Sequence, residues 1–309
     1  MADFSKGIFS LAYDIWNAFI AIAMTLFTTS PIHANNSVYA IVYKCFILLS
    51  DISIPIAIVF FLIAIVKDVI GTPPEQQLRR LLQDTAKLCV LIAILCNLWD
   101  VMGYIMQVAD GITDKIGMKS DYKLEMSSVL EDSINWISNM QTTTKPYLGP
   151  GFTDRLCEWS DQFKNIVMFQ ITLLIGAIGT IIATIGASLT IINCAFQRII
   201  KPLILIPFST ITLAMASGSN EAEQVSRSYI KTFLGLCLTG ALMIISIKIG
   251  VVLINGGGID LNSLMTFSES GSNAERFRQV LFIVIQNGIT PIVIAGLVKG
   301  SESLMQRFL

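Results

Sequence analysis

The feature that most constrains this chain is a set of long apolar segments. Residues 165–197 contain no charged side chain, and several other segments reach about 20 predominantly apolar residues. A helix of that length crosses the roughly 30 Å hydrocarbon core of a bilayer. Charged residues make up 14% of the 309-residue chain, whereas soluble domains average about 25%. We therefore predict an all-α polytopic membrane protein with about five to six transmembrane helices.

The N-terminal segment, residues 1–37, is predicted to hold one helix over residues 8–28. Its polar residues, which include Asp14 and Asn17, recur at helical spacing and form a narrow stripe on an otherwise apolar helix. Such a helix either spans the membrane with its stripe facing other helices or lies in the membrane interface. The sequence leaves both alternatives open.

Segment 38–109 is predicted to hold an interfacial helix and two spans, with a basic cytoplasmic loop between the spans. A single helix over residues 38–70 would be about 50 Å long at 1.5 Å per residue, which is too long without strong tilt. Pro55 and the charged residues around it suggest a division into two parts. Residues 38–50 are then the interfacial helix and residues 52–70 the first span.

The second span of this segment has a clear start signal. Thr72, Pro73 and Glu75 match a capping box with proline at the first helical position. We expect a helix to begin there, with amphipathic first turns outside the bilayer, and to continue as a span over residues 86–109.

Residues 110–163 are predicted to form a helical hairpin outside the cytoplasm. The spacing of apolar residues by three to four is typical of amphipathic helices. The first helix is marked by four such residues: Met126, Leu130, Ile134 and Ile137. The second is marked by three: Leu156, Trp159 and Phe163.

Segment 164–309 is predicted to contain a span rich in small residues, a broken helix and two C-terminal spans. Two neighbouring ridges of small residues run along the first span. One ridge comprises Gly176, Thr180, Thr184 and Ser188, and the other comprises Gly179, Ala183 and Ala187. Small residues let helix backbones approach closely in lipid. The pattern does not distinguish a partner helix of the same chain from one of another copy.

The stretch RIIKPLILIPFSTITLAMASGSN, residues 198–220, is predicted to be a broken or re-entrant helix on the cytoplasmic side. Pro202 disfavours helical backbone at Lys201, so the preceding helix is expected to end near that residue. Residues 202–216 would form a helix of about 22 Å, which is shorter than the hydrocarbon core. Pro207 and Gly218 belong to the same irregular region.

The distribution of Lys and Arg over short loops indicates the orientation. If residues 198–220 return to the side from which they entered, most of these cations fall on one face, which we assign to the cytoplasm. That basic face includes six residues: Arg79, Arg80, Arg198, Lys201, Arg227 and Lys231. If residues 8–28 also span the membrane, there are six spans and both termini are cytoplasmic. Glu223 is expected to pair with Arg227 at i,i+4.

Few residues are suited to catalysis or metal binding. His33 is the only histidine, no cysteine spacing matches a metal site, and no glycine-rich phosphate loop is present. We therefore expect no cofactor and no enzymatic activity. Asp51, Asp100 and Lys248 fall in or near predicted spans. Each is either an ion or proton site or a residue near a span end that pairs locally or snorkels.

The order of these parts resembles a known family. A long span rich in small residues ends in a basic residue, and RIIKPLILIPFSTITLAMASG and SRSYIKTFLGLCLTGALM follow. This arrangement is similar to the TrbL-like, or VirB-six-type, polytopic inner-membrane subunits of type IV secretion and conjugal transfer systems. The resemblance covers residues 165–254 and extends to the rest of the chain only by topology.

The resemblance implies a non-enzymatic subunit of the bacterial plasma membrane that forms or lines the platform through which DNA or protein passes. It implies homo-oligomers, contacts with secretion ATPases and a single-span bridging subunit, and transient contact with the translocating substrate. Five residues match the family's broken-helix region and would then lie at a subunit interface: Arg198, Lys201, Pro202, Pro207 and Gly218. The alternative is a stand-alone small-solute transporter or ion channel that uses Asp100 and Asp51.

Overall fold

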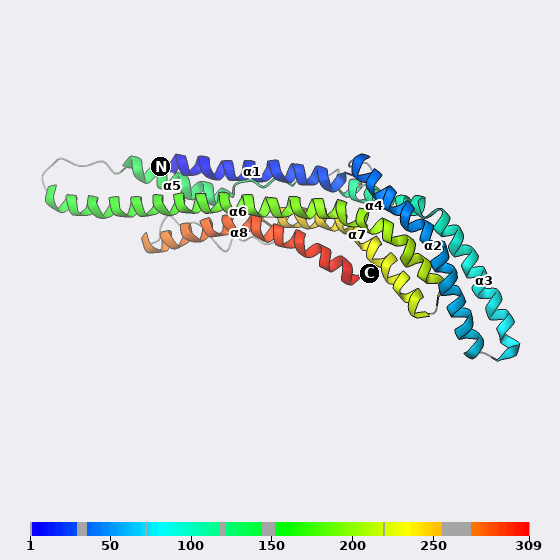
Figure 1. Ribbon diagram of the computed structural model, residues 1–309. Helices are drawn as coiled ribbons and strands as arrows, with labels where there is room; N and C mark the ends of the chain where they lie inside the picture. Colours follow the sequence, from blue (N-terminus) through cyan, green and yellow to red (C-terminus); the bar gives the residue numbers. More distant parts are fainter. Residues whose placement is uncertain are drawn as a thin grey trace. The chain divides into compact units, whose positions relative to one another are not determined.

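The computed structural model describes residues 2–29, 36–71, 73–117, 122–143, 152–218, 220–254 and 273–308. All regular structure in these residues is helical, and Figure 1 shows how the helices follow one another. The eight α-helices are α1 (Ala2–Thr28), α2 (Asn36–Gly71), α3 (Pro74–Cys96), α4 (Leu98–Gly117), α5 (Ser128–Thr143), α6 (Phe152–Ala214), α7 (Asn220–Ile254) and α8 (Asn273–Phe308). A short 3₁₀ turn, η1 (Met215–Ser217), follows α6. The predicted all-α class is confirmed.

Five helices are long and apolar enough to cross a membrane, and a bent pair of helices brings the number to six. The five candidate spans are Phe4–Thr28, Ser37–Lys67, Ile166–Ser217, Asn220–Val252 and Glu275–Met305. The bent pair comprises Gln76–Cys96 and Leu98–Gly117. The chain is therefore a multi-pass membrane protein, as the sequence predicts.

The helices fall into two compact units that differ from the four sequence segments. The first unit comprises Met1–Ala23, Ser120–Asn193 and Ile245–Lys299, and the second comprises Met24–Lys119, Cys194–Ile244 and Gly300–Leu309. Helices α1, α6, α7 and α8 each contribute residues to both units. The segments 1–37, 38–109, 110–163 and 164–309 are therefore not separate packing units.

The core of the first unit is formed by α1, α5, α6 and α8. Buried apolar residues from these helices, among them Phe9, Leu130, Leu173 and Val280, form one cluster. Leu130, Ile134 and Ile137 are all buried, so the predicted apolar face of the first hairpin helix is confirmed. The second predicted hairpin helix is not separate, because α6 begins at Phe152 and continues into the long apolar segment.

The core of the second unit is formed by α2, α3, α4, α6 and α7. Its buried cluster includes Phe46, Leu95, Met106, Leu203 and Phe233. In this unit α2 packs along α3, and both helices contact η1 (Figure 1).

The predicted division of α2 is wrong, because one helix runs from Asn36 to Gly71 through Pro55. Proline removes one backbone donor and crowds the preceding turn, but membrane helices tolerate this when other groups hydrogen-bond to the carbonyls. The hydroxyl of Ser53 donates to the Ser50 carbonyl at 2.7 Å, and the Ser217 hydroxyl donates to the Ala57 carbonyl at 2.6 Å. These bonds lie on either side of the proline.

The predicted continuous span over residues 86–109 is also wrong. The chain bends by 71° between α3 and α4, at Asn97, whose φ of −111° and ψ of 17° lie outside the helical region. Asparagine is a weak helix former. Next to the bend, the Trp99 ring packs on Tyr39, Tyr43 and Phe46, with ring centroids 4.8–5.1 Å apart. This aromatic cluster favours the bent conformation over a straight helix.

The predicted end of the helix near Lys201 is wrong as well. Helix α6 continues through Pro202 and Pro207 to Ala214 and ends in η1. Side-chain hydroxyls hydrogen-bond to carbonyls around the prolines: Tyr229 to Leu205 at 2.6 Å, Ser209 to Ile206 at 2.5 Å and Thr210 to Pro207 at 2.9 Å. The Tyr229 bond ties α7 to α6 beside Pro207, whereas the carbonyls that lose their backbone donors to the two prolines are those of Arg198 and Leu203. The chain then reverses after η1, and α7 packs back against α6. Residues 198–220 therefore do not form a re-entrant segment of their own, and that prediction is wrong.

Some sequence predictions lie outside the described residues. These are the capping residue Thr72 and the histidine His33. Helix α3 begins at Pro74, one residue after the predicted first position, and Pro73 precedes it.

Candidate functional site

A buried ion pair in the second unit is the most distinctive polar feature of the described residues. The Arg198 side chain is 2% exposed and the Asp110 side chain 13% exposed. Guanidinium Nη2 of Arg198 donates to Oδ1 of Asp110 at 2.8 Å. Burying a charge in an apolar environment is costly unless a partner of opposite charge and hydrogen bonds compensate for it. The surroundings of Arg198 supply both.

Helix α4 carries two of the partners on one face. Asp110 and Thr113 are three residues apart, so both side chains point to the same side of the helix. Nη2 of Arg198 lies 3.4 Å from Oγ1 of Thr113, and this hydroxyl donates to the Ala109 carbonyl at 2.8 Å. Met102, Met106 and Ala109 hold this face of α4 in the apolar core. Helix α4 therefore presents the Asp110 carboxylate to α6.

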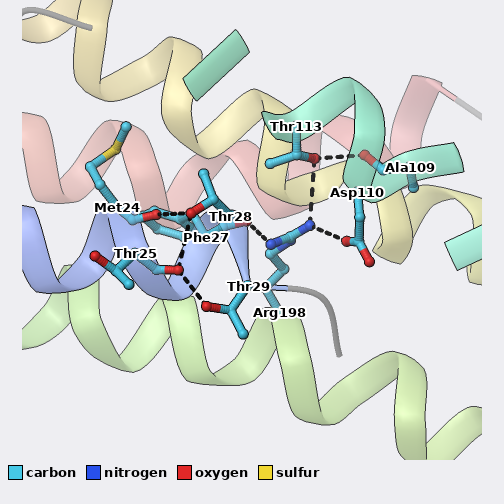
Figure 2. A network of polar contacts seen from close by, with 9 residues as sticks. All are labelled: Met24, Thr25, Phe27, Thr28, Thr29, Ala109, Asp110, Thr113 and Arg198. Carbon is cyan, nitrogen blue, oxygen red and sulfur yellow. Dashed lines mark hydrogen bonds and ion pairs between the residues drawn. The ribbon is translucent and has the colours of Figure 1, made fainter. Parts of the chain in front are cut away.

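The C-terminal end of α1 supplies the third partner. Nη1 of Arg198 donates to the carbonyl of Phe27, in the last turn of α1 (Figure 2). The last carbonyls of a helix have no partner within the helix and carry a partial negative charge. Oγ1 of Thr28 donates to the carbonyls of Met24 and Thr25, both at 3.1 Å, so other carbonyls of the same turn are also hydrogen-bonded. Arg198 thus caps α1 and also neutralises Asp110.

Helix α7 closes the remaining side of the guanidinium. A Cβ atom at Gly240 would overlap Nε, Cζ and Cδ of Arg198, so only glycine leaves room for the side chain at this position. Cys237 lies one turn before Gly240, is buried and borders the same space. Arg198 therefore contacts α1, α4 and α7, and its own helix α6 is the fourth element of the site.

This arrangement is suited to holding helices together rather than to binding a small molecule. The space between Met106, Asp110, Arg198, Pro202 and Cys237 leaves no volume that a water molecule could occupy. The positive charge is matched by one carboxylate and by a helix C-terminus. No group of three or more potential metal ligands occurs among the described residues.

The structure separates the five residues predicted for the broken helix. Arg198, Pro202 and Pro207 are buried by the chain itself and so have little surface left for another subunit. Lys201 forms an ion pair with Glu302 of α8. Gly218 ends η1 with extended backbone and lies close to Phe60 of α2. A subunit-interface role stays a prediction for Lys201 and Gly218.

The two small-residue ridges of α6 have different surroundings. Gly176 packs against α8 so closely that a Cβ atom would overlap Val284, and Thr180, Thr184 and Ser188 are buried. Gly288 of α8 lies beside Thr180. The first ridge therefore has its partner in the same chain. In the second ridge Ala187 is buried and Ala183 half-buried, but Gly179 is exposed and has open space where a Cβ would be.

The predicted intramembrane residues do not converge on one site. Asp51 and Asp100 are exposed, and Lys248 is half-buried. The cations Arg79, Arg80, Arg227 and Lys231 are all exposed. The predicted pair is confirmed, since Nη2 of Arg227 lies 2.5 Å from Oε1 of Glu223.

Sequence reasoning finds Arg198 but misses its partners. Asp110 was assigned to an outer loop, whereas it lies in α4 and contacts Arg198. Arg198 was placed on the cytoplasmic basic face, and its burial beside Asp110 and Phe27 corrects that placement. One signal was present, because Met102, Met106, Ala109 and Thr113 recur at helical spacing and extend the helix past Asp110.

Comparisons with known proteins complete the description of the site. No family model matches the chain, and neither curated proteins nor solved structures gave a match.

Proposed function

We propose that this chain is a channel or scaffold subunit of a type IV secretion machine for conjugative DNA transfer. In this proposal it oligomerises in the bacterial plasma membrane and forms part of the platform that secretion ATPases and a single-span bridging subunit contact. The proposal starts from the resemblance of residues 165–254. The structure supports it in one respect, because those residues supply most of α6 and α7, and both helices contribute to the site of Arg198.

The observation that carries the oligomeric part of the proposal is the position of Asp51. This residue lies near the middle of the candidate span Ser37–Lys67, yet it is exposed on the surface of the chain. A carboxylate at the centre of a membrane helix costs about 2.5–3.5 kcal/mol on insertion scales, and such residues normally face other helices or water. Another subunit or a water-filled path would remove this cost, and a channel-forming oligomer provides both.

A stand-alone transporter is less well supported. Such a protein would place Asp51 and Asp100 around a cavity inside the chain, whereas both residues are exposed on its surface. The buried carboxylate, Asp110, is neutralised by Arg198 and borders no space for a solute.

The orientation forms part of the proposal. Lys67 at the end of α2 and Lys87 of α3 lie close to the turn between α6 and α7, and both border the same pocket as Ser217. Short loops rich in Lys and Arg face the cytoplasm, so we place this turn there. Ser217→Cys should react with an impermeant maleimide only after the cells are opened. Reaction in intact cells would show that this turn lies on the other side of the membrane, opposite to the proposed orientation.

Gly179→Cys tests the oligomer in native membranes, in a variant from which the six native cysteines have been removed. Gly179 is exposed on α6, so we expect a crosslinked dimer with a short bis-maleimide. Thr184→Cys is the matched control, because Thr184 is buried on the same helix and should give no dimer. A monomer in mild detergent together with no dimer from Gly179→Cys would contradict the proposal.

Deletion of the gene tests the secretion role. We expect transfer of the conjugative element from donor cells to be lost and to return with the wild-type gene. Unchanged transfer combined with solute flux in liposomes that contain the purified protein would favour a transporter instead.

A further inference from the structure

A polar pocket of about 250 Å³ lies at one end of the second unit. Four elements line it, and its charged and polar side chains are Lys67 of α2, Asp84 and Lys87 of α3, Ser217 of η1, and Asn220, Glu221 and Glu223 of α7. The pocket is far from the buried ion pair along the chain, since Ser217 lies 19 residues after Arg198 in sequence. Neither the resemblance nor the proposed function assigns a role to it.

The pocket lies at the level where lipid headgroups are expected. Lys67 is the last residue of one candidate span, Ser217 is the last residue of another, and the candidate span of α7 begins at Asn220. Exposed apolar residues continue from the pocket along α2, where Ile63 is 54% exposed and Val66 59% exposed. A lipid whose headgroup entered the pocket could therefore lay its acyl chains along α2.

Three charged groups of the pocket leave their binding capacity unused. Within the part of the chain that the structure describes, no ion pair or side-chain hydrogen bond is formed by Lys67, Lys87 or Glu221. Glu223 differs, because Arg227 binds its carboxylate. Two ammonium groups and at least one carboxylate thus border a space large enough for a small polar group.

We propose that this pocket binds the headgroup of phosphatidylethanolamine. Lys67 and Lys87 contact the phosphate, and Glu221 and Asp84 accept hydrogen bonds from the ammonium group. A primary ammonium has three donors, which suits two carboxylates better than one. The proposal concerns lipid binding by the purified protein and does not depend on the secretion role.

The lining of the pocket distinguishes this headgroup from the two most similar ones. Trimethylammonium groups are recognised by aromatic side chains, and none of the described residues that line the pocket is aromatic. Phosphatidylglycerol carries a phosphate but no cation, so Glu221 and Asp84 would face a neutral glycerol group instead of an ammonium group. A zwitterion with a primary amine matches both kinds of charge.

Competition among lipids tests the proposal. The full chain is reconstituted with equal amounts of phosphatidylethanolamine, phosphatidylglycerol and phosphatidylcholine, purified in mild detergent, and the bound lipid is quantified by mass spectrometry. We expect phosphatidylethanolamine to be enriched about fivefold over phosphatidylcholine, which corresponds to about 1 kcal/mol. No enrichment would overturn the proposal. Binding of soluble phosphoethanolamine without lipid enrichment would overturn it too.

Two variants should change the bound lipid in different ways. Lys87→Gln removes a phosphate contact and should abolish most of the enrichment. Glu221→Gln removes an ammonium contact and a repulsive charge, so phosphatidylglycerol should rise relative to phosphatidylethanolamine. Lys44→Gln is the matched control, because Lys44 is exposed on α2 about 35 Å from Lys67 at 1.5 Å per residue. An equal effect of Lys44→Gln, or no change with Glu221→Gln, would contradict the assignment.

Discussion

Arg198→Met should destabilise the protein strongly, because Arg198 neutralises Asp110 and caps α1. Methionine is unbranched, uncharged and shorter than arginine, so the variant removes the guanidinium donors from the buried Asp110 carboxylate and the Phe27 carbonyl. Breaking a buried ion pair by removing one partner costs about 3–5 kcal/mol. Both side chains of the pair are almost fully buried, so we expect a loss within this range rather than the small loss typical of surface pairs.

A double-mutant cycle separates this explanation from a simple packing defect. Arg198→Met and Asp110→Leu should each destabilise the protein, and the double variant should lie closer to wild type than Arg198→Met does, because no buried charge remains. The free energy of unfolding is measured in mixed detergent micelles by tryptophan fluorescence. Arg227→Met is the control. It breaks the exposed pair with Glu223 and should cost only about 0.3–0.5 kcal/mol.

Two results would refute this reasoning. Unfolding of Arg198→Met at the same detergent composition as wild type would mean that the ion pair contributes no net stability. The second result is that the losses in the two single variants simply add in the double variant. In that case Arg198 and Asp110 would act independently of each other in spite of the 2.8 Å contact.

Three further predictions use the same unfolding assay. Gly240→Ala should lower the free energy of unfolding by about 1–3 kcal/mol, because the new Cβ would overlap the buried guanidinium of Arg198. Gly103→Ala should raise it by about 0.5–1 kcal/mol, since no neighbouring atom lies within 4 Å of a Cβ at that position of α4. Gly176→Ala should lower the free energy of unfolding, because its Cβ would overlap Val284 of α8. Adding Val284→Ala to this variant should restore part of the loss, and a lack of rescue would contradict the contact. Tyr229→Phe should lower the free energy of unfolding by about 0.5–1.5 kcal/mol through the lost bond to the Leu205 carbonyl, and an unchanged stability would show that this bond contributes nothing.

Local patterns in the sequence predicted much of the fold. Apolar length identified the spanning helices, and the period of three to four identified the buried face of α5 at Leu130, Ile134 and Ile137. The Glu223–Arg227 pair was also predictable, because residues four apart on a helix are neighbours. Each of these features depends only on residues that are close together in the sequence.

Helix breaks were predicted poorly because distant residues decide them. Pro55, Pro202 and Pro207 all lie inside continuous helices, while the actual bend occurs at Asn97. Proline disfavours a helix locally by removing a backbone donor. The packing of α6 against α7, which includes the Tyr229–Leu205 bond across 24 residues of sequence, outweighs that local preference. At Asn97 the bend is accompanied by packing of Trp99 against α2. Neither contact can be read from local propensity.

The candidate site was only half predictable for the same reason. A lone arginine at the end of an apolar run has two physical solutions, since it can reach the headgroups or be buried with a partner. Charge counting favours the first solution because it treats every cation as exposed. Asp110, 88 residues away in the sequence, makes the second possible.

The burial of Arg198 changes the argument for orientation but does not remove it. Arg198 is separated from Ser217 by about 28 Å of helix at 1.5 Å per residue, which is close to the thickness of the hydrocarbon core. Its charge is neutralised by Asp110, so it does not count as a loop cation in the positive-inside rule. The exposed cations of the neighbouring helix ends, Lys67, Arg79, Arg80, Lys87, Arg227 and Lys231, still count. The cytoplasmic assignment of the α6–α7 turn therefore rests on these residues, and Arg198 instead joins α1, α4 and α7 to α6.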